Sequence, residues 1–197
     1  RKTYNMEHLK LFPTTVGGFT DLEIAERLMP FARKILDIDG NNSNTWNYKT
    51  SYSSTPSNIN ELEFFSEYTK DLGNKYLNSI GYKSLDLHCD FFFSEMFEED
   101  LHPLHEHPNT VLSGLIYLQV PEGSSDLRFH DPRFHTKVTN LPIIESKDTN
   151  WMWYDVTPEK GLVLIWPGWV AHEVLKNQSK EGRITAVFNL TLLSPNL

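Results

Sequence analysis

The segment His105-Glu-His-Pro-Asn109 leads directly into residues 110–120, Thr-Val-Leu-Ser-Gly-Leu-Ile-Tyr-Leu-Gln-Val, which form the most apolar run of the chain. A second segment, Trp166-Pro-Gly-Trp-Val-Ala-His172, follows a later apolar run. Side chains alternate in direction along a strand, so the two histidines of the first segment are expected on one side. The histidine of the second segment would come from a neighbouring strand. Such an arrangement is typical of a β-scaffold that gathers three ligands around one metal.

The C-terminal part of the chain alternates between apolar runs and turn residues. Extended strands are predicted at residues 85–97, 110–120, 126–130, 151–156, 161–166, 170–175 and 183–193. Short strands separated by turn signals at this spacing indicate a β-sandwich or barrel. We therefore expect a mainly β core of the α+β class over residues 85–197.

Residues 1–84 carry two helical patterns. The first helix is predicted to begin at Thr20, which stands at capping-box spacing from Glu23, and to be kinked or split at Pro30. The second is predicted from an N-cap at Asn60 to a stop at Gly81.

Three weaker patterns accompany the helices. Residues 6–16 are predicted as a short strand, and residues 41–60 as a long polar loop with a short strand at 45–51. Residues 134–150 show little periodicity, and loops of this length within a compact domain are usually functional or disordered. The length of 197 residues predicts one domain, 1–197, with residues 1–84 as a helical elaboration packed on one sheet.

Composition excludes several classes of protein. The net charge of −8 argues against a nucleic-acid binder, which needs a basic face. No apolar run reaches the length of a membrane span, and no secretory leader is recognised. The single cysteine, Cys89, is expected to be buried and inert, and it fits a reducing compartment. We expect a cytoplasmic protein that acts on a small-molecule or peptidyl substrate, and a homodimer remains open.

The histidines differ in their sequence surroundings. His8, His88 and His135 are expected to be ordinary surface or hydrogen-bonded residues. His102 lies close to the first histidine pair, so a pH-sensitive loop is an alternative to a metal site there. Arg183 opens an apolar strand eleven residues after His172. A buried arginine needs an anion, which can be an acidic residue of the fold or the carboxylate of a ligand.

Taken together, the set of His105, His107, His172 and Arg183 resembles the 2-oxoglutarate- and Fe(II)-dependent dioxygenases. Their pattern is His-x-Asp/Glu, a distal histidine, and an arginine about ten residues later. The resemblance is closest to a group of 2-oxoglutarate-Fe(II) oxygenases with a His-x-His-Pro-Asn-Ser motif. Further fragments of that group match here in order, namely Leu11-Phe-Pro-Thr14, Ser113-Gly114, Asp131-Pro-Arg133 and residues 161–172.

The resemblance implies a fold, two cofactors and an activity. The fold would be a double-stranded β-helix, the jelly roll also found in cupins. Fe(II) would be the metal, and 2-oxoglutarate the co-substrate, held by Arg183. The activity would be hydroxylation of an unknown substrate with release of succinate and CO₂. Tyr117, Asn109 and Asn189 are candidates for contacts with the co-substrate, and Trp166 and Arg133 for the substrate pocket, although each could instead be a structural residue.

One position departs from the general pattern. The usual facial triad has two histidines and one carboxylate, whereas position 107 is a histidine. An all-histidine site of His105, His107 and His172 is the first alternative. In the second, Asp131 supplies a carboxylate from a neighbouring strand; in the third, Glu106 does, although it should point away in a regular strand.

Two rival functions remain at this stage. A cupin-like metalloenzyme could use the three histidines without 2-oxoglutarate. A ligand-binding jelly roll without enzymatic activity could use the histidines only to stabilise the fold. Arg183 separates the first rival from the dioxygenase, and metal analysis separates the second.

Overall fold

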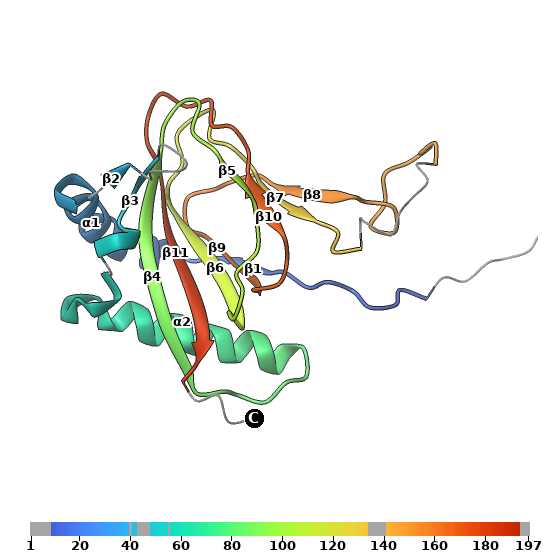
Figure 1. Cartoon of the computed structure of the whole chain (residues 1–197), viewed down its shortest axis with the longest axis horizontal. Coiled ribbons are helices and arrows are strands. Elements are labelled where there is room, and N and C mark those ends of the chain that lie inside the picture. Colours follow the sequence, from blue (N-terminus) through green and yellow to red (C-terminus); the bar gives the residue numbers. More distant parts are fainter. Residues whose placement is uncertain (1–8, 40, 43–47, 55, 134–140, 194–197) are drawn as a thin grey trace, which may run out of the picture.

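The structure is a computed structural model that describes residues 9–39, 41–42, 48–54, 56–133 and 141–193. Its strands form two antiparallel sheets (Figure 1). The larger sheet has the order β1 (Gly17–Thr20), β9 (Leu162–Pro167), β6 (Leu112–Gln119), β11 (Arg183–Leu192), β4 (Leu87–Met96), β3 (Lys49–Thr50) and β2 (Asn41–Asn42). The smaller sheet has the order β5 (His102–His105), β10 (His172–Val174), β7 (Leu127–His130) and β8 (Trp153–Val156).

The two sheets pack face to face. Their shared core contains apolar side chains from both sheets, including Leu115 and Leu164 of the larger and Leu127 and Phe129 of the smaller. Burial of such surface stabilises a fold by about 25 cal/mol per Å². The predicted mainly β jelly roll is therefore confirmed.

Two helices cover the outer face of the larger sheet (Figure 1). They are α1 (Leu22–Asp39) and α2 (Glu63–Ser79), and three short 3₁₀ turns precede α2 at Tyr52–Ser54, Pro56–Asn58 and Asn60–Leu62. Leu28 and Phe65 of the helices are fully buried against Ile116 and Phe188 of the sheet. The expectation of N-terminal helices packed on one sheet is confirmed.

The boundaries of α1 differ from the sequence expectation. Thr20 ends strand β1, and Asp21 is the capping residue, because its Oδ1 accepts a hydrogen bond from the Ile24 N–H at 3.0 Å. The helix runs on through Pro30, so the predicted split is wrong. Pro30 is exposed while Leu28 and Ala32 are fully buried, so packing of the inner face holds the helix together across the missing hydrogen bond.

Residues 9–16 and 141–150 are irregular in the structure. The described residues 9–16 of the predicted strand 6–16 lack strand structure, and the strand of this region is β1 instead. Of the predicted loop 134–150, residues 141–150 form turns with mostly exposed side chains, while residues 134–140 lie outside the described part of the chain. His8 and His135 also lie outside it. Within the described residues, no helix is long and apolar enough to cross a membrane.

Candidate active site

Strand β11 divides its side chains between the two faces of the larger sheet. Ile184, Ala186, Phe188 and Leu190 pack into the core beneath the helices. The alternate residues Arg183, Thr185, Val187 and Asn189 line a cavity on the opposite face, and so do Phe92, Ser94 and Met96 of the neighbouring β4. The period-2 alternation of a strand therefore places a row of polar side chains against the smaller sheet.

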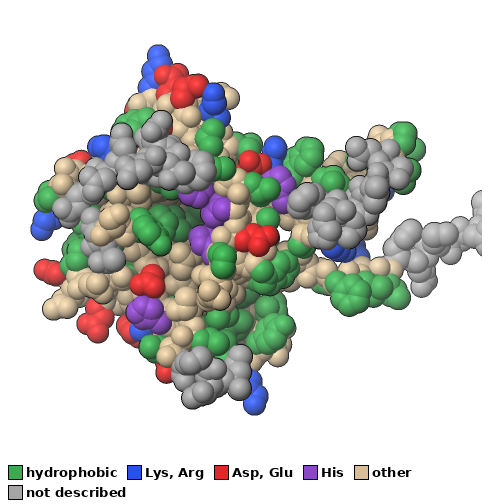
Figure 2. Space-filling model, in the orientation of Figure 1, with side chains coloured by type: hydrophobic (Ala, Val, Ile, Leu, Met, Phe, Trp, Pro, Cys, Tyr) green, Lys and Arg blue, Asp and Glu red, His purple; other side chains and the backbone are tan. Residues whose placement is uncertain are grey.

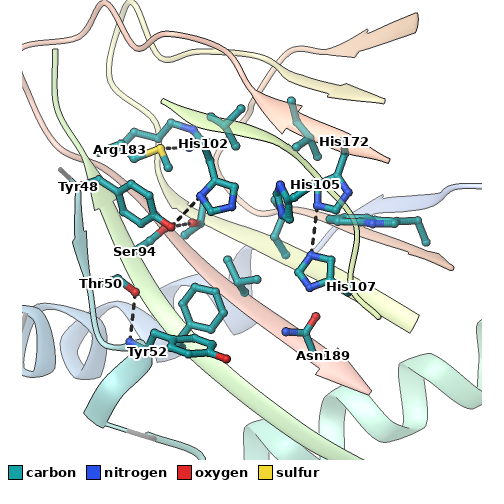
Figure 3. A pocket seen from close by; sticks show the side chains of 18 of the residues that line it. Tyr48, Thr50, Tyr52, Ser94, His102, His105, His107, His172, Arg183 and Asn189 are labelled. Carbon is teal, nitrogen blue, oxygen red and sulfur yellow. Dashed lines mark hydrogen bonds between the residues drawn. The ribbon is translucent and has the colours of Figure 1, made fainter. Parts of the chain in front are cut away.

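The cavity between the sheets has a volume of about 690 Å³. Pockets for small ligands commonly measure about 300–1,000 Å³. The histidines His102, His105, His107 and His172 lie along its other wall (Figure 3), and Figure 2 shows histidine side chains gathered beside a hollow on this face of the molecule. The cavity is thus large enough for more than a five-carbon diacid.

His105, His107 and His172 converge in this cavity. His105 ends β5 and pairs directly with His172 of β10. His107 lies just beyond the strand, where its backbone N–H donates to the Gly168 carbonyl at 2.9 Å. One ring nitrogen from each residue lies within 4.8 Å of the others, so the three histidines could hold a metal ion.

Backbone hydrogen bonds orient two of these rings. The Nδ1–H of His105 donates to the Pro103 carbonyl and that of His172 to the Val170 carbonyl, each at 2.8 Å. Each of these neutral rings therefore carries its lone pair on Nε2. Hydrogen bonds of this kind fix the tautomer and direction of metal-binding histidines in known sites.

The histidine cluster stays uncharged near neutral pH. Burial lowers the pKa of His172 to about 3, with a smaller contribution from the neighbouring His105. Burial likewise lowers the pKa of His107 to about 4, and it lowers the pKa of His105. Neutral imidazole is the form that binds metals, so no proton has to be displaced at physiological pH.

Arg183 lies in the same cavity and is only 1% exposed. Its Nη2 donates to the Tyr117 hydroxyl and its Nη1 to the Met96 sulfur, both at 3.3 Å, while its buried Nε has no hydrogen-bond partner. Among the described residues, no carboxylate forms an ion pair with it. A buried guanidinium without an anion is costly, so Arg183 could bind the carboxylate of a ligand.

The proposed carboxylate ligands lie elsewhere. Asp131 accepts hydrogen bonds from the backbone N–H and the guanidinium of Arg133, both at 3.0 Å, and it is not part of the three-histidine cluster. Glu106, which lies just beyond β5 as His107 does, is exposed between two histidines that line the cavity. The geometry favours the all-histidine alternative, with three neutral donors.

The other candidate residues divide into two groups. Trp166 and Asn189 line the cavity, and Tyr117 contacts Arg183 behind it. Asn109 and Arg133 are exposed and do not line the cavity. Asn109 occupies a turn with φ of 63°, a conformation that asparagine tolerates well, so it has a structural reason to stand at this position.

Sequence reasoning missed the wall formed by Tyr48, Thr50, Tyr52 and Ser53. The Tyr48 hydroxyl is 2.8 Å from Nδ1 of His102, and Tyr52 lies against Phe92. It also missed the buried pair of Ser94 and Thr185, which line the cavity and whose hydroxyls are 2.8 Å apart. Alternation along β4 and β11 places Ser94 and Thr185 on the side that faces the cavity, once the facing sheet is known.

Comparisons with known proteins agree with this geometry. The sequence model of a family described as "Putative 2OG-Fe(II) oxygenase" matches residues 92–189, which include all three clustered histidines and Arg183. No curated protein sequence matches the chain.

Solved structures share the fold. A prolyl-4-hydroxylase from Pseudomonas putida superposes with a TM-score of 0.65 at 12% identity, covering 90% of this chain and 93% of that one. HygX from Streptomyces hygroscopicus, solved with nickel and 2-oxoglutarate bound, gives a TM-score of 0.59 at 12% identity, covering 91% and 84%. The carbocyclase SnoK from nogalamycin biosynthesis, described as α-ketoglutarate dependent, gives 0.62 at 11%, covering 90% and 80%.

The fold, the family match and the chemistry of the cavity point to one class of enzyme. The histidine cluster fits a divalent metal, and the buried arginine fits a dicarboxylate. The chain belongs to the superfamily of 2-oxoglutarate- and Fe(II)-dependent oxygenases.

Proposed function

We propose that His105, His107 and His172 hold Fe(II) and that Arg183 binds the distal carboxylate of 2-oxoglutarate, so that the enzyme hydroxylates a small-molecule or peptidyl substrate. The observation that carries this proposal is the burial of Arg183, without an acidic partner among the described residues, in the cavity that holds the three histidines. When bound, Fe(II) and 2-oxoglutarate supply oxidation of a substrate C–H bond, with release of succinate and CO₂.

The role of each protein group follows from its contacts. Arg183 provides a planar fork for a carboxylate, and the Tyr117 hydroxyl holds one arm of that fork at 3.3 Å. The hydroxyls of Ser94 and Thr185 lie on the cavity floor beside it and can donate to the same carboxylate. Trp166 packs edge-on to His172 with ring centroids 4.9 Å apart and shields the metal position from water.

Three neutral histidines give the proposed site an unusual charge. A facial triad with one carboxylate cancels one positive charge of the metal, whereas this ligand set cancels none. The dianionic co-substrate would neutralise the charge of the metal. With the histidines neutral, Arg183 is the only residue with a formal charge among the described residues that line the cavity. We therefore expect metal and 2-oxoglutarate to bind cooperatively.

The test is succinate release from 2-oxoglutarate under Fe(II), measured with a panel of candidate substrates. 2-Oxoglutarate affinity of the metal-loaded protein is measured by calorimetry. Arg183→Lys keeps the charge but loses the fork, so affinity should weaken by about 1–3 kcal/mol. Arg183→Ala should weaken it more while metal content stays near that of the wild type.

The control is Arg133→Ala, which removes an exposed arginine outside the cavity. It should bind 2-oxoglutarate like the wild type. Unchanged affinity in Arg183→Ala would show that the co-substrate is held elsewhere, and metal binding without any 2-oxoglutarate binding would favour a three-histidine metalloenzyme of another kind.

A further inference from the structure

The cavity has two chemically different ends. Arg183, Thr185, Val187 and Asn189 face it in succession along β11, so Arg183 and Asn189 lie six residues apart on one strand. A strand rises about 3.3 Å per residue, which separates these two residues by roughly 20 Å. Figure 3 shows Arg183 beside Tyr48 and His102 at one end, and Asn189 with Tyr52 at the other, below His107.

The Arg183 end is closed and the Tyr52 end is open. Arg183 is 1% exposed, whereas Tyr52 is 67% exposed. If the co-substrate occupies the closed end, as proposed above, the space between the histidines and Tyr52 remains for the second substrate. The inference below rests on that assignment.

An aromatic pair forms one wall of the open end. Tyr52 and Phe92 meet edge to face, with ring centroids 5.2 Å apart and planes at 83°. The backbone N–H of Tyr52 donates to the Thr50 hydroxyl at 3.1 Å, which helps to fix the turn that carries the ring. Phe92 pairs with Val187 across the β4–β11 ladder, so the wall stands on the rigid sheet.

Asn189 supplies a directed polar group at the same end. Its side-chain Oδ1 accepts a hydrogen bond from the fully buried Ser113 hydroxyl at 2.9 Å. The amide nitrogen has no hydrogen bond to any described residue, so its N–H groups remain as donors for a ligand.

The open end carries no formal charge among its described lining residues. Thr50, Tyr52, Ser53, Phe92, Val187 and Asn189 are all uncharged. A charged group placed there would lose water without gaining an ion pair, which is costly. An uncharged group with a flat or apolar ring instead gains contact with the aromatic pair.

We propose that the open end binds an uncharged, ring-bearing part of the substrate together with an adjacent hydrogen-bond acceptor. The ring packs on Tyr52 and Phe92, and the acceptor, a carbonyl or hydroxyl oxygen, takes a hydrogen bond from the Asn189 amide. Tyr52 and Asn189 are thus specificity-determining residues for the second substrate.

Phenylacetamide is a suitable probe, because it joins an aromatic ring to a neutral carbonyl. Its dissociation constant is measured by saturation-transfer NMR, with acetamide as the probe that lacks the ring. Saturable binding of phenylacetamide is expected, with acetamide at least about tenfold weaker because it lacks the ring contacts.

Two variants test the two contacts. Tyr52→Ala removes an exposed ring, and Asn189→Asp removes the N–H donors but keeps an oxygen for Ser113. Each should raise the dissociation constant of phenylacetamide about threefold to tenfold, the equivalent of one aromatic contact or one hydrogen bond. Tyr82→Ala is the matched control, because Tyr82 is 65% exposed and does not line the cavity. This variant should bind phenylacetamide with the affinity of the wild type.

The proposal is overturned if phenylacetamide shows no saturable binding to the wild type, or if Tyr52→Ala or Asn189→Asp binds it as well as Tyr82→Ala does. The titrations are run both without metal and with Mn(II) and 2-oxoglutarate. If the wild type fails to bind 2-oxoglutarate but phenylacetamide binding still depends on Tyr52 and Asn189, then the proposed function fails and this inference stands. If 2-oxoglutarate binds but neither Tyr52→Ala nor Asn189→Asp changes the affinity for phenylacetamide, then the proposed function stands and this inference fails.

Discussion

His107 and His172 face each other with their Nε2 atoms 3.3 Å apart, although 65 residues separate them in the chain. Their rings are nearly parallel, at 11°. The Nδ1–H of His172 already donates to the Val170 carbonyl, so its Nε2 carries a lone pair. Two such nitrogens are held this close only with a proton or a cation between them. The same spacing would let one metal ion bind both nitrogens in place of that proton.

Replacing His172 with alanine should remove most of the Fe(II) from the purified protein. The variant loses the ligand that the Val170 carbonyl orients, and two histidines alone leave the metal weakly held. Metal content is measured after equilibration with Fe(II) without oxygen. His88→Ala is the control, because that histidine is exposed and pairs with Asp90. Full metal occupancy in His172→Ala would overturn the ligand assignment.

The identity of the third ligand can be tested separately. Asp131→Asn should bind metal like the wild type, because Asp131 is engaged by Arg133 and stands outside the histidine cluster. His107→Asp should retain metal, because a carboxylate restores the usual facial triad, whereas His107→Ala should lose it. Loss of metal in Asp131→Asn would instead make Asp131 a ligand.

Gly114→Ala should destabilise the protein. Gly114 pairs with Phe188 of β11, and an added Cβ would come within 2.1 Å of the Phe188 ring and 2.5 Å of the Leu164 carbonyl oxygen. Neither the buried ring nor the strand backbone can yield freely, so we expect a loss of about 1–3 kcal/mol or more in urea unfolding.

Gly73→Ala provides the comparison. Its added Cβ would meet the flexible ends of leucine side chains, Leu190 at 2.5 Å and Leu87 at 3.2 Å, and no backbone atom. Alanine also favours the helix over glycine by about 1 kcal/mol. It should therefore cost clearly less than Gly114→Ala. Equal losses for the two variants would contradict the steric explanation.

The core strands were predictable because each carries a local signal. Alternation along residues 183–193 puts Arg183 and Asn189 on one face without reference to any other part of the chain. The same alternation predicted that Glu106 points away from His105. Helix ends were less certain, since Thr20 and Asp21 are both good caps and only the hydrogen bond to Ile24 decides between them.

The cavity wall formed by Tyr48, Thr50, Tyr52 and Ser53 could not be predicted in the same way. Tyr48 and Tyr52 stand in a polar stretch without periodicity, so nothing local places them against His102 or Phe92. Asn109 shows the converse, because its closeness to the histidines in sequence does not bring it into the cavity. Contacts that depend on the path of an irregular segment need the tertiary structure.

Cys89 should react very slowly with iodoacetamide in the folded protein. Burial raises the pKa of its thiol from 9.0 to about 11, opposed in part by the Thr69 hydroxyl. At pH 8 the thiolate fraction is then about a hundredfold below that of the unfolded chain. Because the unfolded thiol ionises first, stability from this group is intact below pH 9.0 and declines as pH rises towards 11.

Alkylation followed by mass spectrometry measures this directly, since Cys89 is the only cysteine in the sequence. Protein unfolded in urea is the reference for full reactivity. A folded-state rate close to the unfolded one at pH 8 would mean that Cys89 is accessible and that the packing around it is wrong.

Arg183→Met should separate stability from co-substrate binding. Methionine fills much of the same space and removes a buried charge whose Nε has no partner. The free energy of unfolding of the ligand-free protein should therefore stay constant or rise, by up to about 3 kcal/mol, as it does when buried ionic groups give way to apolar ones.

A ligand at 100 times its dissociation constant stabilises a protein by about 2.7 kcal/mol, so 2-oxoglutarate with Mn(II) should raise the melting temperature of the wild type but not that of the variant. Arg133→Met, at an exposed site, should keep the wild-type response. Strong destabilisation of ligand-free Arg183→Met would show that Arg183 serves the fold through Tyr117 and Met96, rather than being kept at a cost to stability for a carboxylate.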